Sequence, residues 1–182
     1  HRPTHLDAAV GSLLERHFRA DGSLRGRLPD AVFALERDAE GVEGVLIGQE
    51  VRAQAERLMT DRVHAFEGAR LQRTMRQHGG QIPGLKTHLH PYQVEGVAFL
   101  ASRGRALLAD DMGLGKTLQA LGACSVLMDE AGVERVLIVC PASLKSQWRN
   151  EIQRFTSRSV QIVDGNVRQR LAQYRERRAF TI

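Results

Sequence analysis

The chain has 182 residues, of which 26 are basic and 21 acidic, giving a formal charge of +5. A chain of this length can form one domain, or one and a half, around a hydrophobic core. No apolar run approaches the ~18 residues of a membrane span, and the N-terminus lacks a signal-peptide pattern. These properties argue against a membrane-spanning protein, and we expect an intracellular protein with no membrane partner.

The positive charge is unevenly distributed along the chain. Residues 1–85 carry 12 basic and 12 acidic side chains, whereas residues 86–182 carry 14 and 9. This excess in the second half is consistent with a polyanionic partner, and a generally basic surface is the alternative explanation. Cys124 and Cys140 lie singly within apolar runs, without the spacing of a metal site or the density of a disulfide framework, so we predict that both are core residues.

The first half of the chain predicts a mainly helical region. Apolar residues recur at helical spacing in residues 9–18, and a turn follows at Asp21-Gly22. Two apolar bursts within residues 29–48 favour a β-hairpin. From Gln49 onward, a longer apolar stripe predicts a helix that Gly68 interrupts.

Residues 78–84 are polar and glycine-rich, and we interpret them as a linker. They divide the chain into an accessory region of unknown role, residues 1–85, and a second domain, residues 86–182. In the second domain, strands and helices alternate. Expected helices cover residues 91–103, 117–130, 143–155 and 167–174, and expected strands cover residues 107–109, 136–140, 160–163 and 179–182.

This alternation predicts an α/β fold, with a parallel sheet covered by helices on both faces and ligands at the carboxyl ends of the strands. The run at 136–140 is apolar throughout, which is typical of a parallel strand buried on both faces.

The stretch Ala109-Asp110-Asp111-Met112-Gly113-Leu114-Gly115-Lys116-Thr117 has the pattern of a phosphate-binding loop. It precedes an expected helix, whose N-terminal N–H groups and positive dipole end face an anion. Gly113 and Gly115 allow the backbone to approach phosphate oxygens closely. Lys116 supplies a positive charge for the β- and γ-phosphates, and the Thr117 hydroxyl is placed to ligate Mg²⁺. The sequence therefore predicts a site for a nucleoside triphosphate with Mg²⁺.

The loop departs from the strict pattern G-x-x-x-x-G-K-[ST], because Asp110 stands where the first glycine would be. A glycine-rich turn that only caps a helix is the alternative interpretation. The lysine argues against it, because Lys116 is one of three lysines among 26 basic residues. A chain that otherwise uses arginine places a compact ammonium group where phosphates would bind.

Three segments of the second half resemble a known family when they are taken together. Pro91-Tyr92-Gln93 precedes the loop, and Leu137-Ile138-Val139-Cys140-Pro141-Ala142-Ser143 follows it, with Trp148 soon after. Their order resembles motifs Q, I and Ia of the SWI/SNF-type DNA-dependent ATPases of helicase superfamily two. That family usually has D-E-M-G-L-G-K-T, so Asp111 is a conservative replacement. The resemblance covers about residues 86–182 and implies an incomplete RecA-like ATP-binding lobe.

The resemblance also implies roles for individual residues. Gln93 matches the residue that reads adenine through its amide, and a helix-surface glutamine is the alternative. The cradle for the triphosphate and Mg²⁺ is matched by Asp111, Gly113, Gly115, Lys116 and Thr117. Ser143 and Lys145 match the segment that contacts the DNA phosphate backbone, which suits a helix N-terminus that carries a hydroxyl and an ammonium group. A solvated helix start is the alternative for Lys145.

A basic run near the C-terminal end either follows a nucleic-acid backbone or is simply solvated. Its members are Arg168, Arg170, Arg175, Arg177 and Arg178.

The family also has an Asp-Glu pair on a later strand and a second lobe that donates an arginine finger, worth ~10³ or more in rate. The one Asp-Glu pair here, Asp129-Glu130, ends an expected helix. We therefore expect this chain alone to bind ATP with Mg²⁺ without hydrolysing it.

The favoured hypothesis is an N-terminal fragment of a SWI/SNF-like double-stranded DNA translocase, acting in chromatin remodelling or DNA repair. It would work in the nucleoid if bacterial or in the nucleus if eukaryotic, and residues 1–85 would be open to a protein partner. One alternative is a stand-alone, non-catalytic DNA- or protein-binding module derived from such an ATPase. An unrelated P-loop enzyme such as a small kinase is disfavoured, because Gln93 and the segment at Pro141 would then be coincidences.

Overall fold

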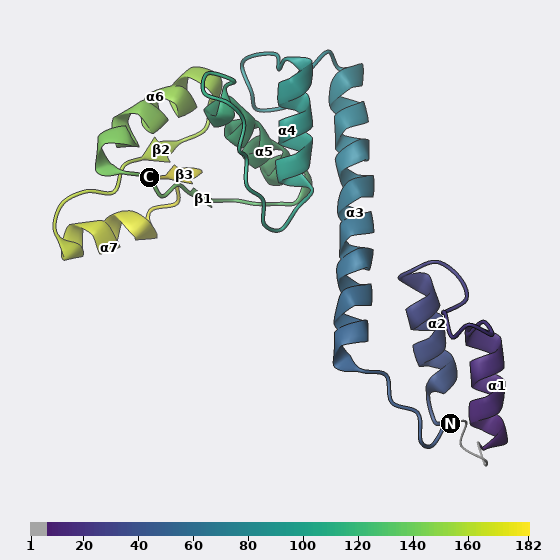
Figure 1. Cartoon of the computed structure of the whole chain (residues 1–182). Coiled ribbons are helices and arrows are strands. Elements are labelled where there is room, and N and C mark those ends of the chain that lie inside the picture. Colours follow the sequence, from purple (N-terminus) through teal and green to yellow (C-terminus); the bar gives the residue numbers. More distant parts are fainter. Residues whose placement is uncertain (1–6) are drawn as a thin grey trace. The chain divides into compact units, whose positions relative to one another are not determined.

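The computed structural model describes residues 7–182 (Figure 1). The chain forms two compact units, one ending at His64 and one running from Ala65 to Ile182. The division falls inside the helix α3, Gln49–Gln77, which is continuous past Gly68, contrary to the expected interruption. The predicted boundary between domains at residues 85 and 86 stays a prediction.

The first unit begins with two helices, α1 (Ala8–His17) and α2 (Asp30–Ala39). Asp7 caps α1, because its carboxylate accepts a hydrogen bond from the backbone N–H of Ala9 at 3.2 Å. The two helices pack together through buried apolar side chains, among them Leu13, Val32 and Leu35. The predicted first helix and the turn at Asp21-Gly22 are confirmed.

The predicted hairpin in residues 29–48 is wrong. The first apolar burst lies within α2, and the second, residues 45–47, forms no strand in the part of the chain that the structure describes. The physical reason is the spacing of Ala31, Val32 and Leu35, which places all three on one helical face against α1. A short apolar run does not by itself distinguish a strand from a buried helix segment.

The segment interpreted as a linker contributes Ile82 to the hydrophobic core of the second unit, and the residues that follow it contribute more. Ile82, Leu85 and Leu89 are all buried. Gly80 has a φ of 79°, and a Cβ at this position would lie 2.3 Å from the carbonyl oxygen of Leu89. The glycine is therefore required by the close approach of two backbone segments.

The second unit contains the predicted α/β fold. Its helices are α4 (Pro91–Ala101), α5 (Lys116–Glu130), the 3-10 turn η1 (Ala142–Leu144), α6 (Lys145–Phe155) and α7 (Val167–Arg175), and its strands are β1 (Val136–Leu137), β2 (Val160–Gln161) and β3 (Phe180–Thr181). The strands form a parallel sheet in the order β1-β3-β2. The α/β class and the helical region before it are confirmed.

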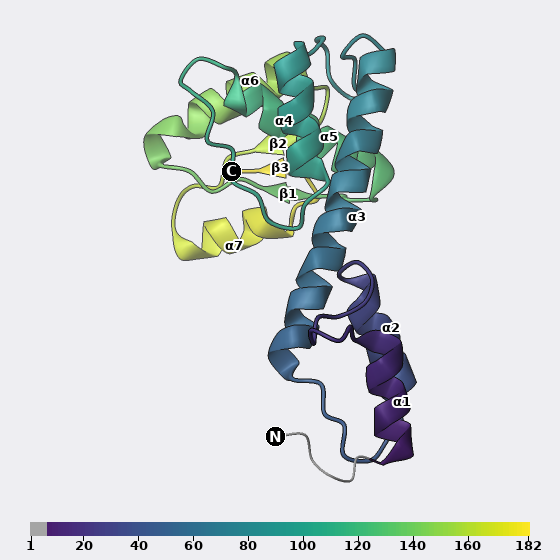
Figure 2. The same ribbon diagram turned by 45° about the vertical axis from the view of Figure 1, so that its right-hand side comes forward.

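The strand order places α6 and α7 on opposite faces of the sheet. The connection from β1 to β2 passes over β3 in one direction, and the connection from β2 to β3 returns in the other. Because parallel crossovers are right-handed, their helices cover opposite faces. Figures 1 and 2 show α6 and α7 on opposite sides of the strands.

The core of this unit lies between one face of the sheet and the helices α4, α5 and α6. Its most deeply buried side chains include Val94, Val97, Leu121, Ile152 and Phe180. Cys124 and Cys140 are half-buried against this cluster, in line with the prediction. No helix in the described part of the chain has both the length and the apolar character needed to cross a membrane.

Two expectations about the strands are wrong. Residues 107–109 form no strand, because none of the described strands pairs with them and an extended segment needs ladder partners. The run at 136–140 is buried on one face only, and Leu137 and Val139 are 60% and 88% exposed. That face is open because all nine side chains of α7, which the structure describes in full, stay at least partly exposed.

Candidate nucleotide-binding site

The glycine-rich loop leads directly into α5, as the sequence predicted, although the helix begins at Lys116 rather than at Thr117. Gly115 caps the helix with φ 73° and ψ 39°, a left-handed conformation that favours glycine. A Cβ at this position would also lie 2.7 Å from the side-chain nitrogen of Gln93. Gly113 has a φ of 87°. The two glycines therefore allow a tight turn into the N-terminus of a helix, where first-turn N–H groups have no intrahelical partner.

Lys116 folds into the loop that precedes it. Its Nζ donates hydrogen bonds of 2.8 Å each to the carbonyl oxygens of Asp110 and Asp111. An ammonium group has three donors, so one is left for another acceptor. Thr117 follows in the first turn of α5 and is half-buried. The loop thus places one ammonium and one hydroxyl at the N-terminal end of α5.

Gln93 connects the start of α4 to the loop. Its Oε1 accepts a hydrogen bond from the backbone N–H of His90 at 3.0 Å, which forms a capping box at the helix N-terminus. Its Nε2 donates to the carbonyl oxygen of Leu114 at 3.4 Å. The residue is 5% exposed. The structure therefore brings together Gln93 and the loop, with one amide N–H and one oxygen lone pair still available.

The chemistry of the loop fits a nucleoside triphosphate with Mg²⁺. Gly115 sits where a Cβ would fill the turn, the N-terminus of α5 favours an anion, and Lys116 adds positive charge. The Thr117 hydroxyl is a hard oxygen donor of the kind that Mg²⁺ prefers. Asp111 is exposed and contributes its carbonyl oxygen to Lys116.

The second predicted contact region, at Ser143 and Lys145, lies in η1 and the first turn of α6. Ser143 is exposed, whereas the Lys145 Nζ donates to the carbonyl oxygen of Val163 at 2.6 Å. One hydrogen bond of the Lys145 ammonium group therefore fixes the start of α6 beside the end of β2.

A hollow of about 460 Å³ is lined both by Lys116 and Thr117 and by side chains of η1 and α6: Leu144, Gln147, Trp148 and Glu151.

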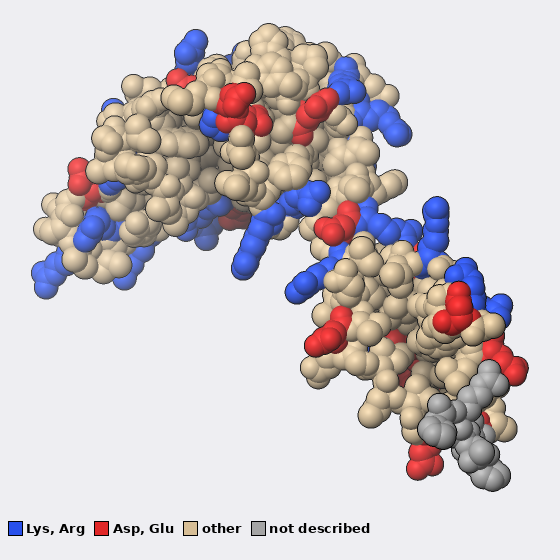
Figure 3. Space-filling model, viewed as in Figure 1, with Lys and Arg blue, Asp and Glu red and all other residues tan. Residues whose placement is uncertain are grey.

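The basic run of α7 and the residues after it is exposed throughout. Arg178 pairs with Glu176 at 3.3 Å, across two exposed side chains. Figure 3 shows Lys and Arg side chains projecting around α7. An exposed run of this kind agrees both with a solvated surface and with a nucleic-acid contact.

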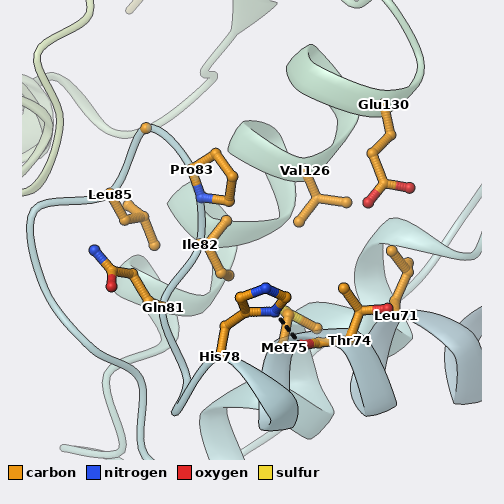
Figure 4. Close-up of a pocket in the computed structure, with 11 residues that line it drawn as sticks. Leu71, Thr74, Met75, His78, Gln81, Ile82, Pro83, Leu85, Val126 and Glu130 are labelled. Atoms are coloured by element: carbon orange, nitrogen blue, oxygen red, sulfur yellow. Dashed lines mark hydrogen bonds between the residues drawn. The ribbon is translucent and has the colours of Figure 1, made fainter.

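A separate hollow of about 380 Å³ lies between the C-terminal end of α3, the segment that follows it and α5 (Figure 4). Its walls are mainly apolar and include Leu71, Met75, Ile82 and Val126. The His78 ring, at its edge, is held by the carbonyl oxygen of Thr74 at 2.8 Å. None of the predicted site residues lines this hollow.

Sequence reasoning missed Gln119, which is fully buried beneath the loop. Its Nε2 donates to the Asp110 carboxylate at 2.9 Å and to the Leu114 carbonyl oxygen at 3.2 Å. A signal was present in the sequence. Ala123 and Val126 lie four and seven residues after Gln119, so a glutamine occupies a position on an apolar helical face.

A parallel α/β sheet with a glycine-rich loop that ends in Lys-Thr at a helix N-terminus is the arrangement of the P-loop class of proteins. Within that class, residues 92–181 match the SNF2-related domain. The resemblance of this half of the chain to the SNF2-type ATPases, seen in the sequence, is therefore confirmed.

The relatives with matching segments are much longer proteins. A SWI/SNF-related matrix-associated actin-dependent regulator of chromatin subfamily A-like protein 1 homolog from Caenorhabditis elegans is 47% identical over 74 residues, covering 40% of this chain and 10% of that protein. The bovine DNA excision repair protein ERCC-6-like is 44% identical over 77 residues, covering 40% and 6%. The DNA repair protein rhp54 of Schizosaccharomyces pombe is 37% identical over 93 residues, covering 43% and 11%.

Among solved structures, the Sulfolobus solfataricus SWI2/SNF2 ATPase core in complex with dsDNA is similar with a TM-score of 0.48 and 29% identity. The match covers 56% of this chain and 22% of that chain. The chain thus spans about a tenth or less of the length of the relatives named above.

Proposed function

We propose that this chain binds ATP with Mg²⁺ through residues 113–117 and Gln93, as part of an SNF2-type ATPase that moves on double-stranded DNA. The observation that carries the proposal is the loop itself. It joins left-handed Gly115, Lys116 and Thr117 at the N-terminus of α5, within the segment that matches the SNF2-related domain. With this function the protein would act where DNA is held, in a nucleus or a nucleoid.

We further propose that these 182 residues alone hold the nucleotide without hydrolysing it. Hydrolysis in this family needs carboxylates beside the loop, and the only Asp-Glu pair of the sequence is Asp129-Glu130. Asp129 is paired with Arg158 at 2.7 Å and Glu130 with Arg70 at 2.5 Å. Both carboxylates lie at the C-terminal end of α5, the opposite end from the loop, where they cannot position water at the triphosphate.

Nucleotide binding is tested by titrating the chain with a fluorescent ATP analogue in the presence of Mg²⁺. Lys116→Ala is expected to weaken binding at least tenfold, since a charged hydrogen bond contributes ~1.5–3 kcal/mol. Lys86→Ala is the matched control, because the Lys86 ammonium group also donates to a backbone carbonyl, that of Gln153 at 3.0 Å, away from the loop. Equal affinities for the wild type and Lys116→Ala would refute the site.

Turnover is measured in the same preparation, with and without duplex DNA. We expect no hydrolysis above the buffer rate in either condition. If DNA stimulated hydrolysis and Lys116→Ala removed that hydrolysis, the proposal that the chain binds ATP would stand. The proposal that the chain alone does not hydrolyse ATP would be refuted.

DNA contact at Ser143 and Lys145 is the second part of the proposal. Both residues stand at the N-terminus of a helix, next to the hollow shared with Lys116. Lys145→Met is expected to weaken duplex binding and to reduce the slope of log K against log salt by about one. Lys86→Met is the control and should leave that slope unchanged. A Lys145→Met slope equal to that of the wild type would remove Lys145 from the interface.

A non-catalytic binding module is the second candidate function. The observation in its favour is that Lys116 already donates to two carbonyl oxygens of its own loop. In that case the chain would bind duplex DNA or a protein partner, the latter through residues 1–85, with an affinity that neither ATP nor Lys116→Ala changes. An affinity for DNA that responds to ATP would reject this candidate.

A further inference from the structure

Gln119 lies under the phosphate-binding loop and cannot itself touch a ligand, because it is 0% exposed. Its Nε2 connects the two arms of the loop, donating to the Asp110 carboxylate at 2.9 Å and to the Leu114 carbonyl oxygen at 3.2 Å. Its Oε1 is buried and has no hydrogen-bond partner among the described residues. Burying an amide oxygen without a hydrogen-bond partner costs free energy of folding. The two hydrogen bonds that Nε2 makes should therefore have a role that offsets this cost.

Asp110 provides that explanation. It occupies the first position of the loop, where the strict phosphate-binding pattern has glycine. A carboxylate free to turn toward the bound phosphates would repel them, and like charges a few ångströms apart interact strongly outside bulk water. It could also compete for the Lys116 ammonium group, which already lies on the carbonyl oxygen of the same residue. In the structure the carboxylate instead points beneath the loop, onto Gln119.

Gly96 of α4 completes the arrangement from the other side. A Cβ at this position would lie 1.7 Å from the Gln119 Oε1. Any larger residue would therefore displace the amide from the place where it reaches both Asp110 and Leu114. The same Leu114 carbonyl also accepts from Gln93 at 3.4 Å, so two glutamine amides from different helices hold one loop carbonyl.

We propose that Gln119 is a positioning residue for the nucleotide loop. Its buried amide holds the Asp110 carboxylate away from the phosphate-binding side and fixes Leu114, which allows this loop to function with aspartate in place of glycine. The proposal rests on the nucleotide-binding function proposed above, and it predicts that Gln119 and Asp110 act as a coupled pair.

The test is a double-mutant cycle on affinity for the Mg²⁺-bound fluorescent ATP analogue. Gln119→Leu keeps the size of the side chain and removes both hydrogen bonds, and we expect affinity to fall about tenfold. Adding Asp110→Gly, which restores the strict pattern, should return affinity to within about twofold of Asp110→Gly alone. Gln153→Leu, on the exposed surface of α6, is the control and should change nothing. A Gln119→Leu variant that binds like the wild type, or that Asp110→Gly does not rescue, would overturn the pairing.

A second readout does not need the nucleotide. Amide hydrogen exchange across residues 110–115 should accelerate severalfold in Gln119→Leu and stay unchanged in Gln153→Leu. If the wild type binds no nucleotide, the proposed function fails, and exchange still decides whether Gln119 holds the loop. Equal exchange rates in the wild type and Gln119→Leu would refute that role.

Gly96→Ala keeps Gln119 in the chain and provides a variant that favours helix formation. Alanine is about 1 kcal/mol better than glycine in a helix interior, so a change governed by helix propensity alone would stabilise the protein. We expect instead the same loss of affinity and the same faster exchange as in Gln119→Leu. A Gly96→Ala variant with wild-type affinity and exchange would contradict the proposed geometry.

Discussion

The contact between α4 and α5 depends on a glycine at position 122. A Cβ at this position would lie 2.8 Å from the Val97 Cγ2, and 3.5 Å from the terminal methyl carbons of Ile82 and Leu85. Val97 is fully buried and β-branched, so its side chain has little freedom to move away. Overpacking of this kind costs ~1–3 kcal/mol, and helix propensity returns ~1 kcal/mol of that in favour of alanine. The difference is ~0–2 kcal/mol, and because a Cβ contact of 2.8 Å forces a buried neighbour to move, we expect Gly122→Ala to destabilise the second unit by about 1 kcal/mol.

The assay is urea unfolding followed by tryptophan fluorescence. The chain has a single tryptophan, Trp148, which lies in α6 and reports on the second unit. Gly68→Ala is the matched control in the same unit. Its new Cβ would meet the Ser102 Oγ at 3.2 Å, a hydroxyl that can rotate, so this variant should be neutral or up to ~1 kcal/mol more stable.

A double-mutant cycle with Val97→Ala separates crowding from other effects. Removing the Val97 methyl groups makes room for the new Cβ, so the double variant should be more stable than the sum of the single changes predicts, by ~1 kcal/mol or more. If Gly122→Ala is as stable as the wild type, or if the two changes are additive, the crowding argument is refuted.

Three further predictions concern single side chains. Ile152→Ala should destabilise the second unit by ~2–5 kcal/mol in urea unfolding, because Ile152 is fully buried and the change leaves a cavity. Hydrogen bonds from His17 and from the nearby Arg16 lower the pKa of Asp38 from its usual 3.8. The ionised carboxylate therefore favours the folded state above about pH 4, and that contribution is lost as the pH falls through the lowered pKa. An NMR titration should find the lowered pKa of Asp38, and His17→Ala should raise that pKa. Burial raises the pKa of the Cys124 thiol, so its alkylation at neutral pH should be slow until urea unfolds the second unit.

Much of the candidate site could be predicted because its chemistry is encoded locally. Gly113, Gly115, Lys116 and Thr117 adjoin one another in sequence, so their residue types alone indicated a turn into a helix. The place of Gln93 beside the loop was expected only from the resemblance to a family, since twenty residues separate the two segments. Gln119 escaped notice because its partners are a carboxylate and a carbonyl group that only the folded loop brings together.

The errors in the fold have a common physical origin. The hairpin expected in residues 29–48 and the strand expected at 107–109 were both inferred from short apolar runs, whose conformation depends on what packs or pairs beside them. Of the strand expected at residues 136–140, only Val136–Leu137 formed. Its hydrophobicity predicted burial on both faces, but α7 leaves one face open. The amphipathic stripe of α6 was predicted correctly because a helix supplies its own backbone partners.

The two hydrogen bonds of the Lys116 ammonium group to its own loop would create closed and open populations if a phosphate had to displace one of them rather than use the third donor. If an arriving phosphate must displace one such bond, worth ~1.5 kcal/mol, about one molecule in ten is open at any moment. The apparent dissociation constant for a nucleotide would then be about tenfold higher than that of the open loop. Anything that held the loop open would behave as an activator of nucleotide binding without contacting the nucleotide, and its own affinity would rise to the same extent when nucleotide is present.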